Sequence, residues 1–433
     1  MNWKILSILI LSLITRIIIY DQNIWWDAAV YLSMAKYIAT LGSIGFWEPI
    51  RPLLWPVILS YSYLLKINII FWGNIISTLF SLGCIYLTYL IGKKLFNENT
   101  GLLASILLSF TWIFLFFNSK LYTEIPTAFF ILLAYYCFLE DKPLASGIFT
   151  ALAFLTKFPA GLILIILSIF YLKDIKNLLI FISSFILTTI PYFVFNYIAY
   201  GSPYQILIFA QEFLKYAGIW IFRQPLYYYP LEIIKQNIIF LLFIPGIILC
   251  IKKKHYSLVL IPLFFLIYFS TMLHKEVRFI ILFLPFIAII SASVYEKIWK
   301  RIDLFILIIL LTLFLNYSIE PINNNPYFTY FEDKQVNELL ITHPLTAFYA
   351  ETESTMMYYP WFNSSQADYW LNYIKTNHPE YISIDTCEGG FICPPDDLEC
   401  INKQSLLLNE INQTYYIEFY KDLGKCKYYI YKN

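Results

Sequence analysis

The sequence is poor in charge: Asp, Glu, Lys and Arg together make up 14% of its 433 residues, against about 25% in soluble domains. This scarcity excludes a soluble globular chain, and the 59% of hydrophobic residues indicates an integral membrane protein. The net charge is +1 and no basic tail or patch is present. Nucleic acid is therefore not expected as a partner.

Motifs of nucleotide-binding proteins and of serine hydrolases are also missing. The chain has no Gly-rich phosphate loop, no Walker motif, no G-x-S-x-G elbow and no internal repeat. Nucleotide-driven transport therefore has no support in the sequence.

Cysteine is scarce, and its placement is uneven. Three of the seven cysteines lie in apolar runs, whereas Cys387, Cys393, Cys400 and Cys426 cluster in the polar C-terminal region. This cluster predicts two disulfides in an oxidising compartment, with three pairings open. A zinc site is the alternative, but the spacing lacks a C-x-x-C knuckle.

Apolar runs that approach the roughly 20 residues needed to cross a bilayer follow one another through the first 320 residues. They predict about eleven transmembrane helices. The fifth and sixth runs are short, and one broken hairpin around Phe158 and Pro159 is an alternative for them. The runs lie at 4–20, 69–92, 101–118, 124–140, 144–159, 161–172, 178–198, 236–251, 257–273, 279–295 and 303–319.

Basic residues in short loops predict the orientation of these helices. With a cytoplasmic N-terminus, four basic clusters all fall on the cytoplasmic side. The same register places the first loop, 20–68, and the four clustered cysteines outside. We therefore expect a multi-pass protein of the plasma membrane. The basic clusters are Lys93-Lys94, Lys173 with Lys176, Lys252-Lys253-Lys254, and Lys297 with Lys300 and Arg301.

The composition changes after about residue 320, where Asn323-Asn324-Asn325-Pro326 predicts a linker. The expected fold is an all-α polytopic membrane domain over 1–320, followed by a small extracytoplasmic α/β domain over 321–433. In the second domain we predict strands at 346–351, 381–385, 415–420 and 426–431, and a helix at 368–377.

The first polar break, residues 20–56, carries Asp27 and Arg51 among several tryptophans that include Trp26. A charge at a helix centre costs about 2.5–3.5 kcal/mol on insertion scales, and indole rings favour the membrane interface. We therefore expect a loop on the bilayer surface, with interfacial helices at 27–40 and 54–65. Loop charges at Asp21, Glu48 and Arg223 are expected to be solvated.

Further ionisable residues lie at the predicted outer ends of the helices. Such groups are costly at membrane depth and mark functional cavities. Acids and bases on one face suit an anionic lipid substrate, because Arg and Lys bind phosphate and a carboxylate can deprotonate a hydroxyl. These residues are Glu124 in KLYTEIPTAFF, Lys157 in FLTKFPAG, Arg51 in RPLLWP, and His274, Lys275, Glu276 and Arg278 in HKEVRF.

The pattern resembles the GT-C superfamily of polytopic glycosyltransferases, which use polyprenyl-phosphate sugars. In that superfamily the first outer loop carries an acid followed by a tyrosine and an alanine on a helix, here Asp27, Tyr31 and Ala35. The turn with Glu124 resembles the second acidic turn of the protein O-mannosyltransferases and aminoarabinose transferases. HKEVRF is similar to the H-K-E-x-R-F string of glycosyltransferase family 22. The protein mannosyltransferases of family 39 usually have Glu directly after the loop acid, where this chain has Ala28.

The resemblance implies an inverting transfer of a sugar, mannose or a similar hexose, from a polyprenyl (dolichyl) phosphate to an acceptor hydroxyl outside the membrane. The acceptor would be a glycan, a lipid or a protein. No cofactor is required, and no metal ligands are predicted. The implied catalytic residues are Asp27 and Glu124. The implied ligands of the donor phosphate are Lys157, Arg278, His274, Lys275 and Arg51, and Tyr31, Glu276 and Trp26 would line the substrate pocket.

Simpler roles exist for the same residues. Asp27 and Glu124 would suit helix N-termini, Lys157 would suit a headgroup contact, and HKEVRF would suit an interfacial anchor. Alternative functions are a secondary transporter or flippase, an oligosaccharyltransferase-like enzyme, or a scaffold. A transporter would place ionisable residues near mid-membrane, in two related halves.

Overall fold

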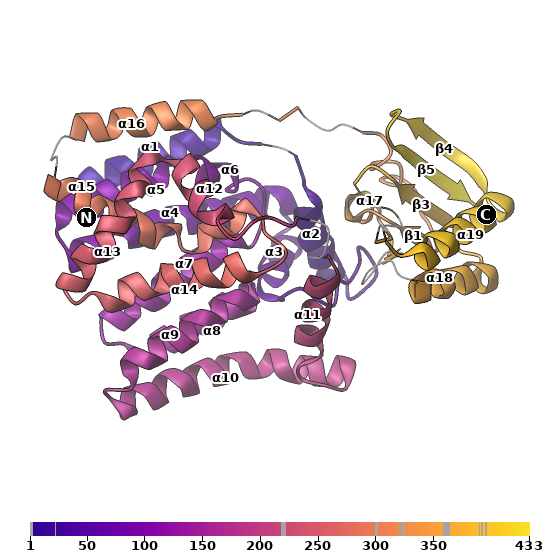
Figure 1. Cartoon of the computed structure of the whole chain (residues 1–433). Helices are drawn as coiled ribbons and strands as arrows, with labels where there is room; N and C mark the ends of the chain where they lie inside the picture. The colour runs from indigo at the N-terminus through magenta and orange to yellow at the C-terminus, as the bar shows by residue number, and fades with distance from the viewer. Residues whose placement is uncertain are drawn as a thin grey trace.

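The computed structural model shows a large helical part followed by a smaller domain built on a β-sheet (Figure 1). It describes residues 3–21, 23–217, 222–298, 302–318, 320–321, 325–357, 364–388, 390, 393–394 and 396–433. Lys300 and Arg301 of the last basic cluster, and Asn323 and Asn324 of the predicted linker, lie outside the described residues.

The helical part consists of α-helices joined by short turns and 3-10 segments. The α-helices are α1 (Trp3–Ile18), α2 (Trp26–Ala39), α3 (Leu54–Leu65), α4 (Ile69–Leu95), α5 (Glu98–Ser109), α6 (Trp112–Phe116), α7 (Glu124–Leu139), α8 (Pro143–Thr156), α9 (Leu162–Tyr171), α10 (Ile175–Tyr200), α11 (Gln205–Ala217), α12 (Tyr228–Gln236), α13 (Phe243–Lys252), α14 (Tyr256–Thr271), α15 (Leu284–Ile298) and α16 (Ile302–Asn316). The 3-10 segments are η1 (Phe158–Gly161), η2 (Ile238–Leu242) and η3 (Val277–Leu282).

Helix length departs from the prediction of about eleven membrane-crossing helices. Within the described ranges, two helices, α4 and α10, are long and apolar enough by themselves to cross a bilayer. Other apolar helices have 10–17 residues. The short fifth and sixth runs form α8 and α9, which are separated by η1 around Pro159. Proline removes a backbone donor, so a single continuous helix is interrupted there.

The core of the helical part is built from closely packed neighbours. Helix α7 packs on α8, α8 packs on α10, and α4 packs on α5. At Gly147 in α8, an added Cβ would collide with the backbone carbonyl of Phe181 in α10. This contact explains why the α8–α10 packing needs glycine at that position.

The C-terminal domain carries a five-stranded mixed sheet in the order β2-β1-β3-β5-β4. Strand β1 pairs in parallel with β2 and β3, whereas β5 pairs antiparallel with β3 and β4. The elements are β1 (Leu339–Ile341), α17 (Pro344–Tyr349), β2 (Ser354–Met356), α18 (Ser364–Asn377), β3 (Tyr381–Asp385), α19 (Leu398–Thr414), β4 (Tyr416–Asp422) and β5 (Lys427–Lys432).

The strand predicted at 346–351 is wrong, because this segment begins as helix α17. Pro344 occupies its first turn, and the His343 side chain accepts a hydrogen bond from the Leu345 amide. Both features favour a helix start. The other three predicted strands are present within one or two residues of the expected bounds. The predicted helix ends at the expected residue but begins four residues earlier, at Ser364, and α19 was not predicted.

The clustered cysteines form two disulfides, Cys387–Cys426 and Cys393–Cys400. The first joins the end of β3 to the start of β5. Cys84, Cys137 and Cys250 are free and buried.

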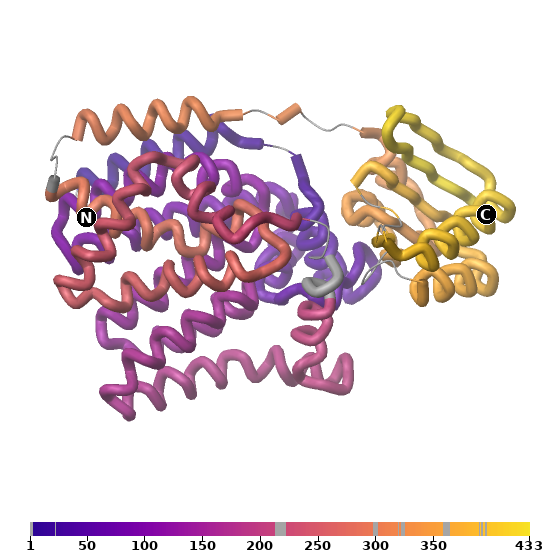
Figure 2. The backbone as a smooth tube through the Cα atoms, in the orientation of Figure 1, coloured from indigo at the N-terminus to yellow at the C-terminus, as the bar shows by residue number. Residues whose placement is uncertain are grey.

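The C-terminal domain docks on α2 (Figure 2), where α17 packs against that helix. Lys36 of α2 donates a 2.5 Å hydrogen bond to the Phe348 carbonyl. The Gly45 amide and carbonyl bond to Thr352 and Ser354, at 3.0 and 2.8 Å. Residues 27–35 of α2 are consequently all buried. The predicted interfacial helices thus exist, but α2 is covered by protein and does not lie exposed on a bilayer.

Candidate functional site

Asp27 lies in the first turn of α2 and is 9% exposed. Trp25 occupies the N-cap position and makes no side-chain capping bond. The carboxylate of Asp27 instead faces two guanidinium groups, so capping does not account for it. The positive end of the helix dipole also favours an anion at this position.

Two arginines bind the two oxygens of Asp27. Arg51 Nη2 lies 2.8 Å from Oδ1, and Arg278 Nη1 lies 2.6 Å from Oδ2. Arg51 comes from the first loop and Arg278 from η3, 251 residues from Asp27 along the chain. The fold therefore brings three of the predicted site residues into direct contact.

These contacts determine the ionisation of Asp27. Burial by itself raises the pKa of this carboxyl, but the positive charges of Arg51 and Arg278 outweigh burial, and the pKa lies below its ordinary range. Burial likewise opposes the charge of Arg278, but Glu276, Asp27 and Glu124 raise the pKa of Arg278 well above its ordinary value. Both groups are therefore charged at neutral pH.

Glu124 is the second predicted acid and the first residue of α7, where it is 1% exposed. Lys157 Nζ lies 2.9 Å from its Oε1, and Arg278 Nε lies 3.5 Å from the same oxygen. Glu124 Oε2 is buried and has no hydrogen-bond partner among the described residues. Lys157 is thus held by Glu124 instead of extending to headgroups.

The HKEVRF segment adds a third acid. Glu276 forms an ion pair with Arg278, and His274 Nε2 lies 2.7 Å from Glu276 Oε1. Burial raises the pKa of Glu276, but Arg278 and His274 outweigh burial and lower it. His274, Glu276 and Arg278 therefore form one network with Asp27.

The other two predicted pocket residues, Tyr31 and Trp26, lie in different surroundings. The Arg51 guanidinium lies 5.4 Å from the ring centre of Tyr31, whose pKa burial raises to about 12. Trp26 faces the C-terminal domain, where its ring meets that of His343 at 4.6 Å. The structure thus places Trp26 at the domain boundary.

Lys275 does not join the network around Asp27. Its ammonium donates a 2.9 Å hydrogen bond to the Gln224 carbonyl. Of the eight predicted acidic and basic site residues, Lys275 alone contacts a different part of the chain.

Three residues near the site have environments that were not predicted. Glu48 was expected to be solvated, but it is 1% exposed and pairs with Arg51, and burial, opposed by Arg51, raises its pKa. The i, i+3 spacing of Glu48 and Arg51 was the available signal. Asp21 pairs with Lys120 at 2.9 Å. The Tyr122 ring centre lies 4.5 Å from the Arg278 guanidinium.

The site combines carboxylates and cations at the ends of several helices. It can hold a phosphate with the cations and can offer Asp27 as a base to a hydroxyl. Among the residues that the structure describes, no three His, Cys, Asp or Glu side chains are grouped closely enough to hold a metal ion.

Comparisons with known proteins show which folds this chain is similar to. The profile of the family "Dolichyl-phosphate-mannose-protein mannosyltransferase" matches residues 50–196, which include Arg51, Glu124 and Lys157. The structure of ArnT from Cupriavidus metallidurans bound to undecaprenyl phosphate superposes with a TM-score of 0.72, at 10% identity, over 98% of this chain and 97% of that chain. The chain has the GT-C fold. The predicted resemblance to polytopic membrane glycosyltransferases is thereby confirmed at the level of the fold.

Other GT-C structures match less completely. The oligosaccharyltransferase AglB from Archaeoglobus fulgidus gives a TM-score of 0.59, at 12% identity, over 99% of this chain and 74% of that chain. The mycobacterial arabinofuranosyltransferase AftD gives 0.57, at 12% identity, over 99% of this chain and 41% of that one. An uncharacterized protein of Aquifex aeolicus is 32% identical over 185 residues, which cover 40% of this chain and 42% of that relative.

Proposed function

We propose that this chain is an inverting membrane glycosyltransferase. It moves a hexose, mannose or a similar sugar, from a polyprenyl phosphate to an acceptor hydroxyl on the extracytoplasmic side. The observation that carries the proposal is the carboxylate of Asp27 held between Arg51 and Arg278. The donor class is supported by the fold: the similar structures of ArnT and AglB contain undecaprenyl phosphate and a dolichol phosphate.

In the proposed reaction, Asp27 accepts the proton of the acceptor hydroxyl as its oxygen attacks the anomeric carbon. The bond between that carbon and the phosphate oxygen breaks, and its electron pair leaves with the polyprenyl phosphate. General-base catalysis of this kind contributes about 10²–10⁴-fold in rate. Attack opposite the leaving group inverts the anomeric centre.

The cations around Asp27 stabilise the departing phosphate. Arg278 contacts Asp27 and Glu276, Lys157 contacts Glu124, and Arg51 contacts Asp27 and Glu48. Preorganised charges of this kind supply the electrostatic part of catalysis. Since they neutralise the leaving group, the proposed reaction requires no cofactor.

Donor binding also activates the base in this scheme. A phosphate that binds Arg278 and Arg51 competes with Asp27 for the same guanidinium groups. As these contacts are shared, the pKa of Asp27 rises toward its ordinary value and the carboxylate becomes a stronger base. In this proposal, Asp27 is therefore an effective general base only when the donor is bound.

The orientation is proposed from the basic clusters and the disulfides. A cytoplasmic N-terminus places the cluster around Asp27 and both disulfides outside, where oxidation is favoured. The acceptor, a glycan, lipid or protein, would approach from that side.

The test is transfer by the purified chain in proteoliposomes, using a panel of polyprenyl-phosphate sugars. Asp27→Asn should abolish donor consumption with the active sugar. Asp333→Asn, which changes an exposed carboxylate of the C-terminal domain, should leave it unchanged. Donor consumption that is equal in wild type and Asp27→Asn would contradict the proposal.

A further inference from the structure

The HKEVRF segment presents its side chains on two different sides. Glu276 has an extended backbone, with φ −126° and ψ 142°, and successive side chains of an extended segment point to opposite sides. His274, Glu276 and Arg278 accordingly join the network around Asp27, whereas Lys275 points away from it. Lys275 thus requires an explanation of its own.

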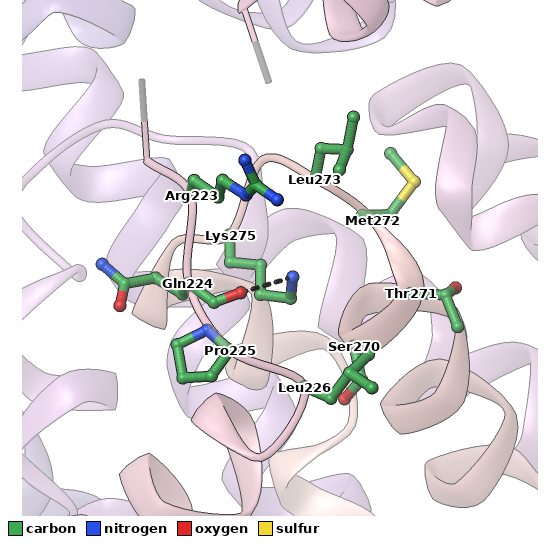
Figure 3. A pocket seen from close by; sticks show the side chains of 9 residues that line it. All are labelled: Arg223, Gln224, Pro225, Leu226, Ser270, Thr271, Met272, Leu273 and Lys275. Carbon is green, nitrogen blue, oxygen red and sulfur yellow. Dashed lines mark hydrogen bonds between the residues drawn. The ribbon is translucent and has the colours of Figure 1, made fainter. Parts of the chain in front are cut away.

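A second segment of the chain meets Lys275 on that other side. Arg223 forms an antiparallel bridge with His274, and the Lys275 amide donates a 3.1 Å hydrogen bond to the Phe222 carbonyl. Together with the end of α14, these residues enclose a pocket of about 400 Å³ (Figure 3). Its lining residues are Arg223, Gln224, Pro225, Leu226, Ser270, Thr271, Met272, Leu273 and Lys275.

The charge of this pocket is unbalanced. Its two ionisable lining residues, Arg223 and Lys275, are both basic, and neither forms an ion pair with a carboxylate in the part of the chain that the structure describes. Lys275 is 6% exposed, and burial together with the charge of Arg223 lowers its pKa. Two cations that line one pocket without a paired carboxylate favour the binding of an anion there.

The surroundings of the two cations are amphiphilic. Leu226 and Leu273 are 69% and 46% exposed, and they line the same pocket as Ser270 and Thr271. Exposed apolar side chains next to an anion site match a molecule with a charged head and an apolar tail. The pocket volume also lies in the ordinary range for small-molecule sites.

We propose that this pocket binds a phosphate group, with Lys275 and Arg223 as its charged ligands. The phosphate is carried by the headgroup of an amphiphile or is free in solution, and the exposed leucines favour the amphiphile. The site is separate from the donor phosphate site around Asp27 and does not depend on transfer activity. Lys275, which was predicted to bind the donor phosphate, is therefore assigned to a second anion site.

The experiment measures retention of dioleoyl phosphatidate and of dioleoylglycerol by the full purified chain in neutral detergent, using native mass spectrometry. These two lipids share their chains and differ in the phosphate. Wild type should retain phosphatidate in preference to dioleoylglycerol. Lys275→Gln and Arg223→Gln should each weaken this retention about tenfold, and Lys275→Arg should restore it.

Matched variants separate this site from its neighbours. Lys235→Gln changes a 65% exposed lysine that pairs with Glu232, and it should leave retention unchanged. Displacement of phosphatidate by millimolar inorganic phosphate would show that the phosphate group alone suffices. If no displacement occurs, the lipid chains are part of the ligand.

Three outcomes would overturn the proposal. The first is equal retention of phosphatidate and dioleoylglycerol by wild type. The second is full retention of phosphatidate by the Arg223→Gln/Lys275→Gln double variant. The third is a loss of retention in Arg278→Gln but not in Lys275→Gln, which would place the phosphate in the network around Asp27. Asp27→Asn should retain phosphatidate like wild type, whether or not the chain transfers sugar. A failure of the proposed transfer function can therefore be told apart from a failure of the proposed phosphate pocket.

Discussion

At the scale of single residues, the site depends on Arg278. Its guanidinium binds Asp27 and Glu276 and approaches Glu124 to 3.5 Å. A planar guanidinium with five donors can hold several acids at once, whereas an ammonium is a single compact charge. Arg278 thus links three carboxylates, each of which also contacts one further basic side chain.

Arg278→Lys should therefore lower transfer about 10²-fold, a loss similar to removing one preorganised donor from a transition-state site. The fold should survive, because the positive charge remains. The measurement is kcat in proteoliposomes, with Lys235→Gln as the control. Activity of Arg278→Lys within about twofold of wild type would mean that charge alone, without fork geometry, is sufficient.

The pH profile tests the competition between Asp27 and the donor phosphate for Arg51 and Arg278. In the free chain the pKa of Asp27 is lowered, so the base is lost only when the pH falls below the ordinary carboxyl range. Donor binding should raise this pKa. The acid limb of kcat should therefore lie at higher pH than the acid limb of kcat/KM, since these report the bound and the free chain. Coincident limbs would contradict the competition.

At the scale of secondary-structure elements, α2 connects the site to the C-terminal domain. Asp27 lies at its start, Lys36 bonds to Phe348, and Gly45 just beyond it pairs with residues 352 and 354. Gly45 has φ +90°, and an added Cβ would collide with the Ser33 carbonyl. The docking of the domain therefore needs glycine at this position.

Gly45→Ala should loosen this docking, because it adds strain of about 1–3 kcal/mol and a backbone collision. We expect faster hydrogen exchange across α17 together with lower transfer. Gly424→Ala serves as the control, since Gly424 also has positive φ but has no atom within 4 Å of an added Cβ. Equal exchange of α17 in both variants would show that Gly45 does not hold the domain.

The elements also show how far the sequence could predict the structure. Charges in apolar surroundings led to the prediction of a site with Asp27, Glu124, Lys157 and Arg278, and the structure brings these four residues into one ion-pair network. The i, i+3 spacing of Glu48 and Arg51 could have predicted their ion pair, whereas the burial of Glu48 depends on contacts made by the folded first loop. The sequence pattern predicts that the charged residues of HKEVRF share one site. The backbone of this segment is extended, however, and Lys275 faces another pocket. The segment at 346–351 became a helix because Pro344 and His343 start one.

At the scale of the whole molecule, two parts meet along α2, the helix whose first turn carries the site residue Asp27. Both parts have apolar cores, and the C-terminal domain also carries both disulfides. The GT-C fold could be predicted from residue patterns, but helix lengths could not. Several apolar helices have only 10–17 residues, because their apolar runs continue through turns and 3-10 segments.

Reduction of the disulfides should destabilise the C-terminal domain selectively. Cys387–Cys426 closes a 39-residue separation, and loss of such a crosslink costs about 2–4 kcal/mol. Hydrogen exchange over β3 and β5 should rise after reduction, while that of α7 and α8 stays constant. An equal rise in both parts would show that they unfold as one unit.

The central claim is that Asp27 acts as the base and that Arg51 and Arg278 are shared between it and the donor phosphate. The most direct measurement compares donor affinity and single-turnover transfer in wild type and Asp27→Asn, with the active polyprenyl-phosphate sugar. We predict that transfer falls about 10²–10⁴-fold, while donor binding is equal or tighter because a competing carboxylate has been removed. Transfer by Asp27→Asn within about tenfold of wild type, at equal donor occupancy, would contradict the account.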